Sequence, residues 1–323
     1  MNKSLKKTIL LGAKSLGIFR TARVLSSRRL RVLAYHGIES DDSVVNRDGF
    51  HVPPAIFARQ LEHISRCYRI VSLQDVITAM REGTPWPERS VLITFDDGYR
   101  NNVEVAAPLL AQQGIPAAFF VTTGFIDGTH QPWWFILRRW VLKAGFSSLG
   151  DPPGMTETPC RSDIQCLVRW EYFLKGLTEA ERAAHMTAIA TRLGLPPESG
   201  ASFASWDQLA SLCRQGHAVE PHTVSHANLG RESAADANRE VTSSVMRIKE
   251  KLGIQARAFA YPYGRAEDVQ PAVFDTLKQQ AISVGFTTVE GTNRPETNPY
   301  LYHRLNITGR HQGLGFEKLL AMG

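Results

Sequence analysis

From residue 30 onward, short apolar or β-branched runs alternate with longer stretches whose apolar positions recur every three or four residues. The short runs predict strands, and the longer stretches, several of which end at a glycine, predict helices. The expected strands are 30–38, 68–73, 90–98, 116–124, 217–223, 256–264, 281–291 and 300–308. The expected helices are 54–66, 72–83, 102–114, 206–216, 235–253 and 271–281. This alternation indicates βα units around a mainly parallel sheet, and seven or eight strands favour closure into a barrel.

The stretch from about 125 to 205 interrupts this alternation. It is rich in tryptophan and helix-like at 133–145, passes through a Pro/Gly-rich turn, and is helix-like again over 163–193. We therefore expect a barrel over 30–323 with a helical insertion at about 125–205.

Basic residues concentrate at the N-terminus. Nine of the 37 Lys and Arg residues lie within the first 31 positions, before the first acidic residue, Glu39. The rest of the chain holds 28 basic and 31 acidic residues, so a nucleic-acid-binding body is not supported. The apolar side chains of residues 1–29 fall largely on one helical face and the lysines on the other. We expect a basic amphipathic arm that either contacts an anionic membrane surface or packs on the domain as an ordinary helix.

No cleavable signal peptide is recognised in this arm, because Lys14 interrupts its apolar run and no small-residue cleavage site follows. The four cysteines form no C-x-x-C pair and no dense framework, so a reduced compartment is the expected one. We expect a cytoplasmic protein, peripheral on the membrane if the arm binds lipid.

Unusual polar residues follow four of the expected strands, and the carboxyl ends of the strands of a β/α barrel open on one face. They occur in the segments LAYHGI, ITFDDGY, EPHTVSH and FAYPYG. His222 and His226, four positions apart, are predicted to lie on one side of a helical turn, from which both can reach one metal ion. Taken alone, the pair also fits loop histidines, and Asp96-Asp97 fits a helix cap. Two histidines and one carboxylate together leave a coordination position open, which is typical of a hydrolytic metal site.

The motifs TFDDG, H-T-x-x-H and YPYG, in this order, resemble the polysaccharide deacetylase family, also called the NodB-homology group or carbohydrate esterase family 4. The resemblance runs from about Leu30 to the C-terminus, apart from the insertion. It implies a distorted (β/α)7 barrel that removes acetyl groups from N-acetylated sugars with a divalent metal, usually zinc.

The resemblance also implies a role for each matching residue. Asp96 corresponds to the catalytic base; Asp97, His222 and His226 correspond to the metal ligands. The backbone N–H of Tyr263 corresponds to the donor that stabilises the oxyanion. The general acid is His36, as in family members whose first strand supplies this histidine, or else His303. His217 is interpreted as structural.

Two family features are not matched. The arginine that orients the base is missing from its usual place before the YPYG turn, which leaves Arg257 and Arg304 as alternatives. No Asp-Trp pair of the family's fourth motif is found.

We therefore expect a metal-dependent N-deacetylase that acts on an amino sugar of a polysaccharide, such as an exopolysaccharide under synthesis, or of a lipid-linked glycan. The alternatives are a deformylase or another amide or ester hydrolase on a lipid-linked sugar, and a catalytically silent glycan-binding protein. Trp133, Trp134 and Trp140 either line the substrate cleft or pack inside the insertion, and packing is the expectation for at least two of them.

Overall fold

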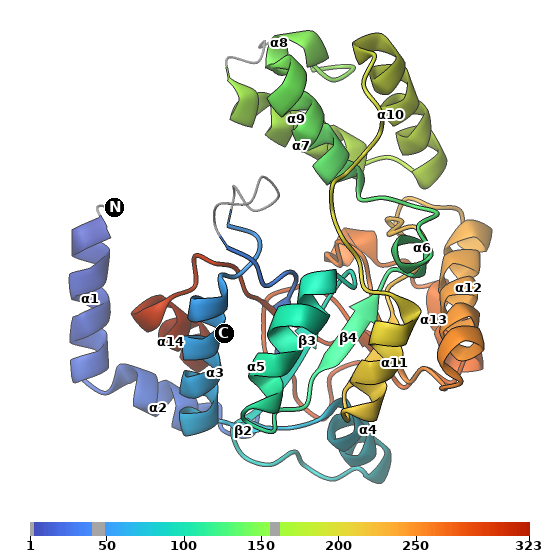
Figure 1. The fold of residues 1–323 in the computed structure, drawn as a ribbon. Coiled ribbons are helices and arrows are strands. Elements are labelled where there is room, and N and C mark those ends of the chain that lie inside the picture. The colour runs from blue at the N-terminus through green and yellow to red at the C-terminus, as the bar shows by residue number, and fades with distance from the viewer. Residues whose placement is uncertain (1–2, 41–48, 156–161) are drawn as a thin grey trace.

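Each of the eight expected strand segments contains a strand in the computed structural model, which describes residues 3–40, 49–155 and 162–323 (Figure 1). The strands are β1 (Arg31–Tyr35), β2 (Arg69–Ile70), β3 (Ser90–Phe95), β4 (Ala118–Val121), β5 (Ala218–Pro221), β6 (Ala258–Ala260), β7 (Val284–Phe286) and β8 (Leu305–Asn306). All ladder pairs between them are parallel, in the order β5-β4-β3-β1-β8, with β2 on the first residues of β3 and with β6 paired to β7.

Both faces of the central strands are buried, which explains their continuous apolar runs. In β1, Leu33 and Tyr35 face the surrounding helices, whereas Val32 packs inside the barrel against Phe120 and Tyr302. Side chains alternate between the two faces of a strand, so one strand supplies both the inner core and the layer under the helices.

The outer helices include all six that the periodicity predicts, and a C-terminal helix that was not predicted. Their bounds are α3 (Pro54–Cys67), α4 (Leu73–Glu82), η2 (Asn102–Ala106) continuing as α5 (Ala107–Ala111), α11 (Trp206–Arg214), α12 (Ala234–Leu252), α13 (Val273–Gln279) and the unpredicted α14 (Gly313–Met322). The segment η2 is a π-helix that ends at Ala106, two residues before Pro108. A proline has no N–H for the regular helical hydrogen bond, and this favours a local change of helix type.

No backbone ladder joins β5 to β6 among the described residues; a side chain makes the connection instead. The carboxyl group of Glu220, in β5, accepts hydrogen bonds from the backbone N–H groups of Arg257, at 2.8 Å, and Ala258, at 3.0 Å. Glu220 is buried, and burial raises the pKa of its carboxyl to about 8, although the two N–H groups act in the opposite direction.

This raised pKa predicts a pH-dependent contribution to stability. The neutral carboxyl is favoured in the folded state, so the contribution is fully present below the ordinary pKa of 4.5 and is lost as the pH rises through about 8. We expect Glu220→Gln, which stays neutral and keeps an acceptor oxygen, to match the wild type in melting temperature at pH 5. At pH 9 it should melt roughly 5 °C higher.

Thermal unfolding of both proteins at the two pH values tests this expectation. Glu62→Gln, at an exposed position of α3, is the control and should change neither value. If the melting temperatures of Glu220→Gln and the wild type differed by the same amount at both pH values, the predicted pH dependence from Glu220 would be contradicted.

Four helices between β4 and α11 form a separate layer above the barrel, the green group at the top of Figure 1. They are α7 (Trp133–Ala144), α8 (Phe146–Leu149), α9 (Asp163–Lys175) and α10 (Glu179–Leu193). They share a core that includes Trp140, Leu149, Trp170 and Ile189. The short α6 (Thr123–Ile126) connects them to β4. Cys67 and Cys213 are free thiols, and Cys160 lies outside the described residues.

The N-terminal residues form α1 (Lys3–Ser15) and α2 (Ile18–Leu25), which lie beside α14 at the edge of the molecule (Figure 1). Phe19 of α2 is buried, whereas Leu5, Ile9 and Leu16 of the predicted apolar face are exposed. Lys14, on the opposite face, pairs with Glu317 of α14 at 2.9 Å. The helix therefore contacts the body through a charged residue and leaves apolar side chains in solvent. No helix in the described part of the chain is long and apolar enough to cross a bilayer.

Candidate active site

The carboxyl ends of the strands bring the sequence motifs together, and the backbone there is strained. Among the described residues other than glycine, six have a positive φ, and four of these are Asp97, Thr223, His226 and Tyr263. A left-handed conformation is unfavourable for such residues and persists only where the surrounding structure enforces it. Four of the six such residues lie in the motif segments. The surrounding structure therefore fixes the backbone of these loops, and with it the positions of their side chains.

Asp97, His222 and His226 converge on one point. The Nε2 atoms of His222 and His226 lie 3.6 Å and 3.3 Å from Oδ1 of Asp97, and one ligand atom from each residue lies within 4.8 Å of the others. All three side chains are buried, and Oδ1 of Asp97 has no well-aligned hydrogen-bond donor among the described residues. Two imidazole nitrogens directed at one buried carboxylate oxygen fit a divalent metal ion.

The predicted helical turn between the two histidines is wrong. Residues 222–228 form an irregular loop after β5, in which Thr223 and His226 have φ values of 65° and 62°. The carboxylate of Glu240, in α12, fixes this loop by accepting hydrogen bonds from the backbone N–H groups of Val224 and Ser225. The two histidines therefore reach the same point because tertiary contacts fix the loop that carries them, and not because of helical periodicity.

Hydrogen bonding and burial prepare His222 as a ligand. Its Nδ1 lies 2.7 Å from the carbonyl oxygen of Ala260, so Nδ1 carries the proton and Nε2 is left with a free lone pair. Burial lowers the pKa of His222 to about 4, which keeps the ring neutral near pH 7. The pKa of Asp97 is also lowered, because nearby His226, His36 and His222 outweigh the effect of burial. His222 and Asp97 are thus in the protonation states that metal binding requires.

Arg304 is paired with Asp96, which decides between the two arginines that the sequence left open. Its Nη1 and Nη2 donate to Oδ1 and Oδ2 of Asp96 at 2.8 Å and 2.7 Å, and both side chains are buried. Burial by itself raises the pKa of Asp96, but the guanidinium reverses this effect, so the net pKa is lowered. Arg257, in contrast, contacts Glu220 through its backbone. Asp96 is therefore held as an oriented carboxylate that retains lone pairs for a proton.

His36 and His303 lie in different surroundings. His36 follows β1, packs against Phe50 with ring centroids 4.2 Å apart, and is close enough to Asp96 and Asp97 for their charges to raise its pKa. Burial outweighs this effect and lowers the pKa overall. The backbone of His303 is hydrogen-bonded to the side chain of Asn293, away from these carboxylates. The choice of His36 as general acid stays a prediction.

The YPYG turn places Tyr263 beside the histidines. Its ring lies edge-on to His226 at 4.8 Å, and Thr288 contacts its carbonyl oxygen. Gly264 has φ 65°, and a Cβ there would lie 2.8 Å from the backbone nitrogen of Thr288, so only glycine fits. No described residue accepts a hydrogen bond from the Tyr263 backbone N–H. This free donor suits the oxyanion role that the resemblance implied.

The insertion contributes one tryptophan to the site itself. Trp134 is partly exposed and packs on His226 with ring centroids 4.9 Å apart. Trp133 and Trp140 are buried in the core of the insertion, although Nε1 of Trp133 also donates to the hydroxyl of Tyr263 at 3.0 Å. Packing thus accounts for two of the three, as expected. His217 is structural, since its Nδ1 accepts from the backbone N–H of Ala117 at 3.2 Å.

Comparison with known proteins agrees with this geometry. The family model described as polysaccharide deacetylase matches residues 83–289. The chain belongs to the polysaccharide deacetylase family. The predicted resemblance is therefore confirmed, and the chain is placed among carbohydrate-deacetylating hydrolases.

Known proteins resemble this deacetylase over most of its length at low sequence identity. A Bacillus subtilis (strain 168) protein named as a polysaccharide deacetylase, YxkH, is 20% identical over 292 residues, which cover 89% of this chain and 75% of that protein. The Streptococcus pyogenes deacetylase PplD, in complex with acetate, superposes with a TM-score of 0.62 at 18% identity, over 90% of this chain and 98% of that one. IcaB from Ammonifex degensii superposes with a TM-score of 0.60 at 20% identity, over 92% of this chain and 98% of that one. These likenesses confirm the NodB-type barrel.

Proposed function

We propose that this deacetylase removes N-acetyl groups from amino sugars of a polysaccharide or lipid-linked glycan precursor by metal-dependent hydrolysis. The observation that carries the proposal is the buried convergence of Asp97, His222 and His226 beside the Asp96–Arg304 pair. The first group offers three metal-ligating side chains that meet at one point, and the second offers an oriented base next to them. A site that only bound glycans would need neither.

The residues divide the reaction among them. A divalent ion held by Asp97, His222 and His226, with zinc as the expected metal, would polarise the amide carbonyl and make water more acidic. Asp96 takes the proton of the attacking water, and the Tyr263 N–H stabilises the negative charge that develops on the carbonyl oxygen. His36 donates the proton that the leaving amine needs.

The N-terminal helices support a location at a membrane. We propose that residues 1–30 contact an anionic membrane surface, because apolar side chains of this segment are exposed and its charge is positive. At such a surface the enzyme would meet a lipid-linked glycan or an exopolysaccharide that is still growing.

Acetate release from N-acetylated oligosaccharides tests the reaction. Protein stripped by a chelator is expected to release no acetate above background, and added Zn²⁺ should restore both activity and one bound metal ion per chain. Full activity of the metal-free protein would contradict the proposal. Metal binding without acetate release would instead favour another acyl group, such as formyl, or a glycan-binding role.

A further inference from the structure

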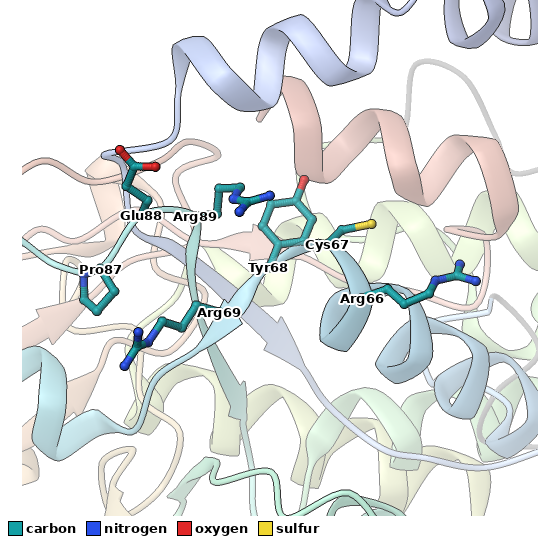
Figure 2. Close-up of a pocket in the computed structure, with 7 residues that line it drawn as sticks. All are labelled: Arg66, Cys67, Tyr68, Arg69, Pro87, Glu88 and Arg89. Atoms are coloured by element: carbon teal, nitrogen blue, oxygen red, sulfur yellow. The ribbon is translucent and has the colours of Figure 1, made fainter.

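A cavity of about 310 Å³ lies at the end of the barrel opposite the candidate active site (Figure 2). It is lined by the end of α3, the first residue of β2 and the turn before β3: Arg66, Cys67, Tyr68, Arg69, Pro87, Glu88 and Arg89. Figure 2 shows Arg89 beside the Tyr68 ring, whereas the side chains of Arg66 and Arg69 extend outward from the cavity in opposite directions. Three arginines and a single acidic residue, Glu88, thus line this cavity.

The charges of these arginines are not neutralised by ion pairs. Arg66, Arg69 and Arg89 are exposed, and none of them pairs with a carboxylate in the part of the chain that the structure describes. Exposed surface arginines elsewhere on the barrel, such as Arg239 and Arg294, lie next to an acidic partner. The cavity therefore has a net positive charge available for an anionic ligand.

The end of α2 borders this cavity. The backbone N–H of Arg89 donates to the carbonyl oxygen of Ser27, and Arg23 is close enough to Tyr68 to lower its pKa, although burial raises that pKa overall. Leu25, at the end of α2 that borders the cavity, is 82% exposed, and Leu16, just before the start of α2, is 79% exposed. One exposed leucine thus lies beside the positively charged cavity, and a second lies at the other end of the same helix.

We propose that this cavity binds the phosphate headgroup of an anionic phospholipid while the leucines at the ends of α2 enter the boundary between headgroups and acyl chains. Guanidinium groups bind phosphate oxygens through paired N–H donors, and each basic residue near an anionic leaflet strengthens binding. Exposed leucines do not contribute to binding a soluble phosphate compound or nucleic acid. Burial of their apolar surface in lipid is favourable and strengthens binding to a membrane.

The position of the cavity has a consequence for the enzyme. Arg69 begins β2 and Arg89 precedes β3, whereas Asp96 and Asp97 follow β3. The six residues of β3 span roughly 20 Å, so a headgroup in the cavity leaves the candidate active site at the far end of the strand. Lipid binding is therefore compatible with access of a glycan to the site. The inference rests on the membrane contact proposed above for residues 1–30, but it does not depend on the metal or on the reaction.

Co-sedimentation of the full chain with phosphatidylcholine vesicles, with and without phosphatidylglycerol, tests the inference. The wild type should bind only the anionic vesicles, and added salt should weaken the binding. The triple variant Arg66→Gln, Arg69→Gln, Arg89→Gln should bind them roughly 100-fold more weakly, at about a factor of five for each arginine. The variant Leu16→Ser, Leu25→Ser should lose about tenfold.

The triple variant Arg239→Gln, Arg265→Gln, Arg294→Gln removes the same charge from other exposed positions and should bind like the wild type. Equal loss in both triple variants would mean that net charge alone matters, which would overturn the cavity assignment. A second outcome would also overturn the assignment. In that outcome the wild type does not bind the vesicles, and inorganic phosphate or duplex DNA raises the melting temperature of the wild type but not that of the Arg66, Arg69, Arg89 variant.

Discussion

Asp96→Asn is expected to slow acetate release from an N-acetylated oligosaccharide by a factor on the order of 10²–10⁴. Asparagine has nearly the same shape but cannot take a proton from the attacking water. In the structure, both oxygens of Asp96 accept hydrogen bonds from the buried Arg304, so this carboxylate has one fixed orientation. Steady-state rates under saturating zinc give the comparison.

Removing the charge of Asp96 also leaves Arg304 buried without its partner, at a cost of about 3–5 kcal/mol. Metal content and thermal unfolding therefore have to accompany the rates. The variant should still bind one metal ion, because Asp97, His222 and His226 are intact. Asp207→Asn, at an exposed position of α11, serves as the control. A folded, metal-loaded Asp96→Asn protein with wild-type activity would show that Asp96 is not the base.

His226→Ala should abolish stoichiometric metal binding and reduce activity by a factor on the order of 10³, since a Lewis-acid metal contributes several kcal/mol to the transition state. His226 supplies one of the two imidazole nitrogens directed at Asp97 Oδ1, and the loop that holds it is fixed by Glu240. Equilibrium dialysis with Zn²⁺ measures the binding directly.

His303→Ala is the matched control, because it removes another imidazole outside the cluster. It should bind Zn²⁺ as the wild type does. If it also keeps full activity while His36→Ala does not, His36 is the general acid. Unchanged zinc binding by His226→Ala would remove this residue from the metal site.

The sequence alone predicted the eight strand segments and the polar residues at their carboxyl ends. Both follow from local patterns, because an apolar run long enough for one strand can be recognised from a few consecutive residues. It also predicted which residue types share the site, since parallel strands in a barrel end on the same face. Arg304 was only one of two alternatives, because its pairing with Asp96 joins positions 208 residues apart.

The shape of the His222–His226 loop could not be derived from spacing, which predicted a helical turn. The loop conformation depends on Glu240 from α12, and closure of the barrel between β5 and β6 depends on the side chain of Glu220. Likewise, the tryptophans of the insertion looked alike in the sequence, yet Trp134 alone packs on His226 through its ring. The sequence therefore determined the elements and the chemistry that they carry, because periodicity and residue type are local. Only the tertiary structure decided the orientation of Asp96, the shape of the loop that carries His222 and His226, and the basic cavity beside α2, because each arises from contacts between distant segments.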